Sequence, residues 1–220
     1  MNAPLPKAYK DGHVDFYGRD FLITPAVLIP RPETETIIDI VKSLTGKPIL
    51  PGVKAPVAVV PEDSKILDVG TGSGCIAISI KKELPLSKVT GVDIERSALE
   101  IAEKNARNLN TDVKFLQSDL LNNVTETPDI LIANLPYVDK NWDWLNLDAL
   151  SYEPSTALFA DDHGLALIKK LIDQATGLKI NHIILEADPC QHQTIRDYLP
   201  DGYELEKTNG FILYIRRVPR

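Results

Sequence analysis

From Ser64 onward, short hydrophobic runs alternate with segments whose hydrophobic positions recur every three to four residues. The runs predict buried strands and the recurring positions predict amphipathic helices. The predicted strands cover 66–69, 89–94, 113–116, 129–133 and 182–187, and the predicted helices cover 75–84, 96–109, 164–176 and 191–199. Strands that alternate with helices indicate an α/β fold, a doubly wound and mostly parallel sheet covered on both faces.

Both ends of the chain carry hairpin patterns. Residues 203–207 and 211–216 predict a hairpin across Asn209-Gly210, which brings the sheet to seven strands and adds an antiparallel C-terminal strand. Residues 14–29 predict a second β-hairpin around Gly18. Pro32 suits the first turn of the helix that follows. We therefore expect an N-terminal segment with a hairpin over 1–30 and a main domain over 31–220, interrupted by a proline-rich loop at 45–63.

Length, charge and cysteine content narrow the class of protein. The 220 residues suffice for one sizeable core. The net charge of −7 argues against direct nucleic-acid binding, because proteins that bind nucleic acids usually carry a positive charge. Cys75 and Cys190 lack metal-type spacing, so we expect no metal site and two buried, reduced thiols. Without a signal-peptide pattern or a long apolar run, we expect no membrane association and a cytoplasmic location.

The turn after the first strand of the main domain has the composition of a cofactor site. Its glycines let the backbone approach a ligand, and the helix that follows offers free N–H groups at its N-terminus. Asp93 and the adjacent Ile94 end the next strand, where a carboxylate accepts ribose hydroxyls, and Asp119-Leu120 follow the third strand at the height of an adenine ring. The residues of the turn are Asp68, Gly70, Thr71, Gly72, Ser73 and Gly74.

These residues alone leave two cofactors open, S-adenosylmethionine and a nicotinamide dinucleotide, because the glycine spacing also fits the loose dinucleotide fingerprint. The end of the fourth strand, Asn134-Leu135-Pro136-Tyr137, favours the first. The Asn134 side-chain carbonyl and the Leu135 backbone carbonyl accept both hydrogens of an NH2 group and turn its lone pair toward an electrophile. Pro136 stiffens the turn and Tyr137 offers a flat face. Hydride transfer has no use for this arrangement.

Four segments, in this order, resemble the glutamine-N5 methyltransferases of peptide chain release factors: 27–35, 66–74, 134–138 and 152–158. The resemblance implies a Rossmann-like class I methyltransferase domain, S-adenosyl-L-methionine as methyl donor, and the Gly-Gly-Gln loop of a release factor as acceptor. It assigns Gly70 to Gly74 to the methionine moiety, Asp93 to the ribose and Asp119-Leu120 to the adenosine. Asn134, which also borders the methyl donor, forms the glutamine pocket with Leu135, Pro136 and Tyr137.

The sequence departs from this family in two places. Leu135 stands where the family usually has proline, and Asn-Leu-Pro-Tyr is also similar to the motif of ribosomal RNA adenine dimethyltransferases. Family members usually begin with a helical domain that helps to bind the release factor, whereas this sequence starts almost at the hairpin. A small partner protein is the expected substitute for such a domain. Arg31 and Glu33 are candidates for the border of the substrate pocket.

Three functions therefore stay open from the sequence. The favoured one is methylation of a release factor glutamine. The second keeps the methyl chemistry but directs it at ribosomal RNA or at a glutamine of another translation protein. The third is a module that binds the cofactor and catalyses nothing.

Overall fold

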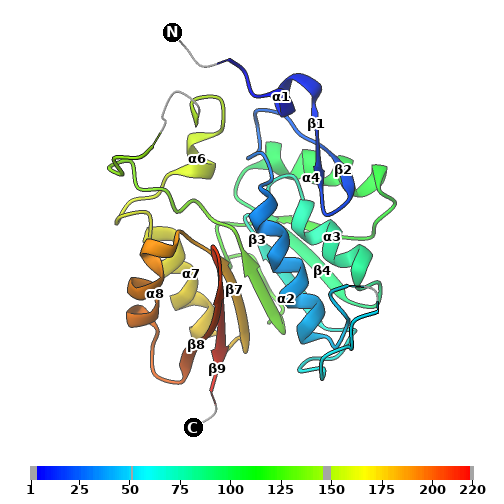
Figure 1. Cartoon of the computed structure of the whole chain (residues 1–220), viewed down its shortest axis with the longest axis vertical. Helices are drawn as coiled ribbons and strands as arrows, with labels where there is room; N and C mark the ends of the chain where they lie inside the picture. The colour runs from blue at the N-terminus through cyan, green and yellow to red at the C-terminus, as the bar shows by residue number, and fades with distance from the viewer. Residues whose placement is uncertain (1–3, 51, 146–149, 219–220) are drawn as a thin grey trace.

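The computed structural model describes residues 4–50, 52–145 and 150–218, and its centre is a seven-stranded sheet (Figure 1). The strand order is β5-β4-β3-β6-β7-β9-β8. Only β9 runs against its neighbours, which confirms the predicted parallel sheet with one antiparallel C-terminal strand. The strands are β3 (Lys65–Val69), β4 (Lys88–Asp93), β5 (Lys114–Gln117), β6 (Ile130–Ala133), β7 (His182–Glu186), β8 (Tyr203–Asn209) and β9 (Ile212–Arg217).

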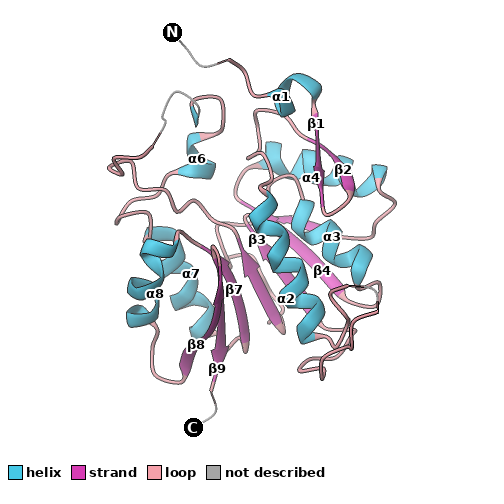
Figure 2. Cartoon of the chain, in the orientation of Figure 1, coloured by secondary structure: helices cyan, strands magenta, loops and turns pink. Residues whose placement is uncertain are grey.

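Helices cover both faces of this sheet (Figure 2). Successive residues of a strand point to opposite faces. Accordingly, Ile130 and Ile132 of β6 pack in one cluster with α2 and α3, whereas Leu131 packs in another with α7 and α8. All four residues of β6 are buried, as expected of a central parallel strand. The helices are α2 (Thr36–Leu44), α3 (Cys75–Glu83), α4 (Arg96–Asn108), α7 (Ala166–Gly177) and α8 (His192–Tyr198).

The N-terminal segment packs against α4. A short helix, α1 (Lys7–Asp11), which the sequence did not predict, precedes the hairpin of β1 (His13–Phe16) and β2 (Arg19–Leu22). Tyr17 and Gly18 form the turn with positive φ angles of 52° and 67°. Asn105 on α4 accepts a hydrogen bond from the Leu22 N–H and donates to the carbonyls of Leu22 and Ser73. The hairpin is thereby tied to the glycine-rich turn, and the predicted division at residue 30 stays a prediction.

Two long connections contain little regular structure. Residues 45–50 and 52–63 contain neither helix nor strand, as expected. In the loop between β6 and α7, residues 155–158 form one helical turn, α6 (Ser155–Leu158), after Pro154. Residues 146–149 of that loop lie outside the described ranges. Two 3-10 turns complete the fold, η1 (Pro32–Glu35) and η2 (Pro189–Gln191).

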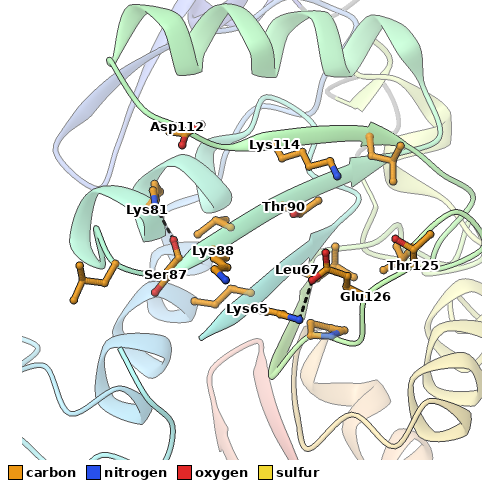
Figure 3. A pocket seen from close by; sticks show the side chains of 16 residues that line it. Lys65, Leu67, Lys81, Ser87, Lys88, Thr90, Asp112, Lys114, Thr125 and Glu126 are labelled. Atoms are coloured by element: carbon orange, nitrogen blue, oxygen red, sulfur yellow. Dashed lines mark hydrogen bonds and ion pairs between the residues drawn. The ribbon is translucent and has the colours of Figure 1, made fainter. Parts of the chain in front are cut away.

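The sheet has a hollow at each end of its parallel strands. The one at the amino ends of β3, β4 and β5 has about 350 Å³ and is bordered by lysines, among them Lys65, Lys88 and Lys114 (Figure 3). It exists because residues 118–129 join β5 to β6 without a helix, so part of one sheet face stays uncovered. Lys65 forms an ion pair of 2.8 Å with Glu126 there. The other hollow lies at the carboxyl ends, where ligands of such sheets bind.

Candidate functional site

A cavity of about 400 Å³ opens at the carboxyl ends of the central strands. It lies where the sheet order changes direction, since the chain leaves β3 for β4 on one side and later returns to β6 on the other. Cavities of this size accommodate small ligands and cofactors, and this position is the usual one in open α/β sheets. The cavity is lined by residues from each of the five candidate site regions singled out in the sequence, at 69–73, 93–95, 118–120, 134–136 and around Arg31.

The glycine-rich turn connects β3 to α3 at the base of this cavity. Gly70, Gly72 and Gly74 have φ angles of 73°, 54° and 79°. At Gly74 there is a second constraint, because a Cβ would lie 3.0 Å from the Ala102 Cβ and from the Ile78 Cδ1. Glycine thus allows the turn and also the close approach of α3 to α4. The free N–H groups at the start of α3 follow directly.

Asp93 links this turn to the end of β4. One carboxylate oxygen accepts a hydrogen bond of 2.9 Å from the Gly72 N–H, and the other accepts one of 2.9 Å from the Glu95 N–H. Burial raises the pKa of Asp93, and these two N–H groups oppose the rise. The side chain borders the cavity with its orientation fixed from both sides.

Asp68 lies behind the turn and does not line the cavity. It is fully buried, and its Oδ2 accepts a hydrogen bond of 2.6 Å from the Thr71 hydroxyl. No hydrogen-bond partner for its Oδ1 exists among the described residues. Burial raises the pKa of Asp68 to about 7. Its position is that of a support for the turn rather than of a contact with a ligand.

Asp119, Leu120 and Ile94 border the cavity together, as the sequence predicted for one end of the ligand. Asp119 forms an ion pair of 2.8 Å with Lys170. Leu120 is buried at a positive φ of 49°, and Ile94 remains 58% exposed. An apolar pair beside a carboxylate is suited to a flat ring that carries an amino group.

Asn134, Leu135 and Pro136 line the same cavity at the end of β6. The Asn134 Nδ2 donates a hydrogen bond of 3.2 Å to the Thr34 hydroxyl. No residue in the described ranges donates to the Asn134 Oδ1 or to the Leu135 carbonyl. Two oxygens on adjacent residues therefore accept no hydrogen bond from the described residues, and their predicted role as acceptors for a ligand stays a prediction.

Tyr137 differs from its neighbours because it does not line the cavity. Its hydroxyl donates to Glu186 Oε1 at 3.1 Å, and its carbonyl accepts from the Gln191 side chain at 2.8 Å. Burial raises the pKa of Tyr137, and the charge of Glu186 raises it further. The phenol is thus held as a neutral hydrogen-bond donor beside the carboxylate.

The two residues proposed for the substrate border occupy different places. Arg31 lines the cavity and forms an ion pair of 2.5 Å with Glu153. Glu33 is exposed and is absent from the cavity wall. Glu153, which is buried, also accepts a hydrogen bond from the Ile29 N–H. The segments around residues 30 and 154 are thereby joined, and both contribute to the wall.

Several polar residues near the site were given no role from the sequence, namely Thr34, Glu153, Glu186 and Gln191. Glu186 gave a detectable signal, because it is an acid at the end of the hydrophobic strand 182–187. Burial raises its pKa, and the hydrogen bonds from Thr34, Tyr137 and Asn134 oppose that rise. The described part of the chain contains no cluster of three or more His, Cys, Asp or Glu side chains that would hold a metal ion. Cys75 is buried as expected, but the expectation of a buried Cys190 was wrong, because its side chain is exposed.

The charges on the cavity wall favour a cationic ligand. Three carboxylates, Asp93, Glu95 and Asp119, border it, whereas Arg31 is the cation among its lining residues.

Among the helices of the described residues, none has the length and apolar character that a membrane span requires.

Residues 51–148 match the family model of the methyltransferase small domain. The release factor glutamine methyltransferase of Koribacter versatilis is 42% identical over 88% of this chain and 68% of its own length. The enzyme of the same name from Streptococcus pneumoniae is 34% identical over 91% and 70%.

A solved structure with a similar fold is a 16S ribosomal RNA methyltransferase of T. thermophilus in complex with AdoMet and guanosine. Its TM-score is 0.61 at 14% identity, and the match covers 94% of this chain and 50% of that one. At this identity the likeness concerns the fold alone.

Proposed function

The chain belongs to the family of release factor glutamine methyltransferases, and on that premise we propose that it methylates the side-chain amide of a glutamine in a peptide chain release factor. The methyl donor is S-adenosylmethionine, and the acceptor is the glutamine of the Gly-Gly-Gln loop, whose N5 nitrogen receives the methyl group. The observation that carries this proposal is a pair of oxygens, Asn134 Oδ1 and the Leu135 carbonyl, which belong to residues of the cavity wall and accept no hydrogen bond from the described residues.

The residues of the cavity fit the methyl donor in charge and shape. The free N–H groups at the start of α3 suit its carboxylate, and Asp93 suits the ribose hydroxyls. Asp119 and Leu120 suit the amino group and the face of the adenine. The acidic wall complements the positive sulfonium and ammonium groups.

When bound, S-adenosylmethionine supplies an electrophilic methyl group on a neutral leaving group, so the chain has no acid to provide. Its residues orient the acceptor and exclude water. An amide nitrogen is a weak nucleophile because its lone pair is delocalised into the carbonyl. Hydrogen bonds from the NH2 group to Asn134 Oδ1 and the Leu135 carbonyl localise that lone pair and direct it into the cavity.

Leu135 does not remove this acceptor, because the backbone carbonyl is present with leucine or proline at that position. Its side chain is buried and would contact a Cβ at Gly70 at 3.0 Å. Packing of the Leu135 side chain against the glycine-rich turn restrains the backbone at this position, as the ring of a proline would. The departure from the family motif is therefore compatible with the proposed pocket.

Docking of the release factor involves more than this cavity. Arg31 borders the cavity beside the acceptor oxygens and is proposed to contact the protein substrate. A small partner protein that helps to bind the release factor is part of the proposal, as is action in the cytoplasm.

The test is a methyl-transfer assay with radiolabelled S-adenosylmethionine and purified release factor. We expect label on the wild-type release factor and none on a variant whose Gly-Gly-Gln glutamine is replaced by alanine. Asn134→Ala should lower the rate by about 10²-fold, equivalent to about 3 kcal/mol of lost alignment. Label on the alanine variant, or transfer to ribosomal RNA instead, would contradict the proposed acceptor.

A further inference from the structure

Thr34 and Glu186 connect three separate elements behind the acceptor oxygens. Glu186 ends β7, the strand beside β6, and is 3% exposed. Its Oε2 accepts a hydrogen bond of 2.6 Å from the Thr34 hydroxyl, which lies in η1, 152 residues away in the sequence. Thr34 in turn accepts from the Asn134 Nδ2 at 3.2 Å. The three side chains form one continuous hydrogen-bonded line that ends at the cavity.

The chemistry of these groups fixes the direction of that line. An ionised carboxylate accepts hydrogen bonds and donates none, and a threonine hydroxyl has a single proton. Because Thr34 gives its proton to Glu186, only its lone pairs remain for Asn134. The amide of Asn134 must therefore present its NH2 group to Thr34, which turns its Oδ1 away from Thr34.

Resting on the function proposed above, we infer that Thr34 and Glu186 are positioning residues, which hold the Asn134 amide with its oxygen toward the acceptor. Rotation of this amide by 180° would place Oδ1 against a hydroxyl oxygen that has no proton to donate. It would also present an NH2 group to the incoming amide, which carries hydrogens of its own. The line thus makes one of the two orientations of the Asn134 amide dominant. In that orientation, Oδ1 accepts a hydrogen bond from the NH2 group of the substrate glutamine.

The same carboxylate also holds Tyr137, whose hydroxyl donates to the other oxygen, Oε1. One buried glutamate therefore receives hydrogen bonds from both sides of the pocket motif, through Thr34 to Asn134 and directly from Tyr137. A network that served stability alone would tolerate any arrangement in which every donor and acceptor is hydrogen-bonded. The direction of this network depends on the Glu186 carboxylate, which accepts hydrogen bonds and has no proton to donate.

Isosteric substitutions separate positioning from stability. Thr34→Val keeps the volume and removes the hydroxyl, whereas Thr34→Ser keeps the hydroxyl. Glu186→Gln keeps the shape but adds an NH2 group, which donates to Thr34 and frees its proton to point at Asn134. Thr45→Val is the matched control, because Thr45 is equally buried but its hydroxyl bonds only to the carbonyls of Val41 and Lys42.

We expect kcat for transfer to the release factor to fall about 30-fold in Thr34→Val and in Glu186→Gln, the loss of roughly one oriented hydrogen bond. The Kd for S-adenosylmethionine should stay within about twofold, because Thr34 lines the cavity but neither Thr34 nor Glu186 is among the residues proposed to contact the methyl donor. Thr34→Ser should restore most of kcat, and Thr45→Val should leave kcat unchanged. Unchanged kcat in Thr34→Val, or an equal loss in Thr45→Val, would overturn the inference.

A second measurement remains valid even if the wild-type protein transfers nothing to a release factor, the result that would refute the proposed function itself. The side-chain NH2 resonances of Asn134, identified by their disappearance in Asn134→Asp, report its hydrogen bond in an NMR spectrum. We expect slow exchange with water in the wild type and in Thr34→Ser, and fast exchange in Thr34→Val. Fast exchange in the wild type would overturn the positioning role regardless of activity.

Discussion

Arg31 and Glu153 are 122 residues apart in the sequence and form an ion pair that joins two parts of the cavity wall. Their Nη2 and Oε1 atoms lie 2.5 Å apart, and the second oxygen of Glu153 accepts from the Ile29 N–H at 3.1 Å. The Glu153 side chain is 4% exposed and that of Arg31 is 35% exposed. The segment before η1 and the segment before α6 are thereby held together.

Glu153→Ala should weaken both the fold and the cavity. We expect the free energy of unfolding to fall by about 1–3 kcal/mol, mostly from the partly buried N–H of Ile29 that loses its acceptor, because the exposure of Arg31 limits the charge contribution. The Kd for S-adenosylmethionine should rise about tenfold as the wall loosens. Urea denaturation and calorimetric titration measure the two effects. Glu204→Ala, which breaks an exposed pair with Arg216, should cost less than about 1 kcal/mol, and equal losses would contradict the prediction.

Asp93→Asn should weaken binding of the methyl donor. Asparagine retains one acceptor oxygen, and its NH2 group must face either the Gly72 or the Glu95 N–H, so the turn loses a hydrogen bond. We expect the Kd for S-adenosylmethionine to rise by about 10- to 100-fold, measured by calorimetric titration. Asp129→Asn is the control, since Asp129 accepts from the Lys65 N–H at the opposite edge of the sheet. Unaltered affinity in Asp93→Asn would remove this residue from the donor site.

Asp68 should make stability depend on pH. Burial raises its pKa from 3.8 to about 7 in the folded protein, so folding favours the protonated form. The resulting stabilisation is fully present below pH 4 and is lost as the pH rises through 7. Asp68→Asn, which is neutral at every pH, should therefore gain stability relative to the wild type between pH 4 and pH 8, by at most about 4 kcal/mol.

Urea denaturation of both proteins across this range measures that difference. The pKa values of Asp93 and Glu186 are also raised by burial, but both proteins share these groups, so their effect cancels. If the free energies of unfolding of the two proteins change with pH in parallel, ionisation of Asp68 does not destabilise the folded state and the prediction is wrong.

Gly74→Ala should destabilise the protein more than a positive φ alone explains. An alanine there would meet Ala102 and Ile78 at 3.0 Å, at a φ of 79°. Gly12 has a similar φ of 74° but no atom within 4 Å of the position of a Cβ. We expect Gly12→Ala to cost about 1 kcal/mol in free energy of unfolding and Gly74→Ala about 2–4 kcal/mol, both measured by urea denaturation. Equal costs would show that α3 and α4 separate without penalty.

The sequence was sufficient to predict that the ends of the strands lie together, because parallel strands of one sheet end at the same edge. Once 66–69, 89–94 and 129–133 are read as parallel strands, Asp93 and Asn134 must lie at one edge of the sheet. Asp68 shows the limit of that reasoning. It lies near the end of β3, but its side chain points behind the turn rather than to the cavity. Because both faces of this strand are buried, the sequence pattern does not show which of the two directions a side chain takes.

Contacts between distant segments explain the rest. Thr34 was noticed only within the segment 27–35, and its partner Glu186 lies 152 residues further on. Glu153 was noticed only as part of a resemblance, whereas its bond to Arg31 depends on how the segment after β6 folds back over the sheet. Short turns such as α1 and α6 have too few residues for a periodic pattern to be recognised.

The separation of the Asn134–Thr34–Glu186 line from the glycine-rich turn has an evolutionary consequence. The parts proposed to recognise what receives the methyl group come from η1 and the ends of β6 and β7, whereas those proposed for the nucleotide come mainly from β3, β4 and β5. Substitutions at Thr34 or Glu186 would therefore change the first set without replacing a residue of the second. On this proposal, one scaffold can alter which amide it accepts while it inherits the same means of holding its methyl source.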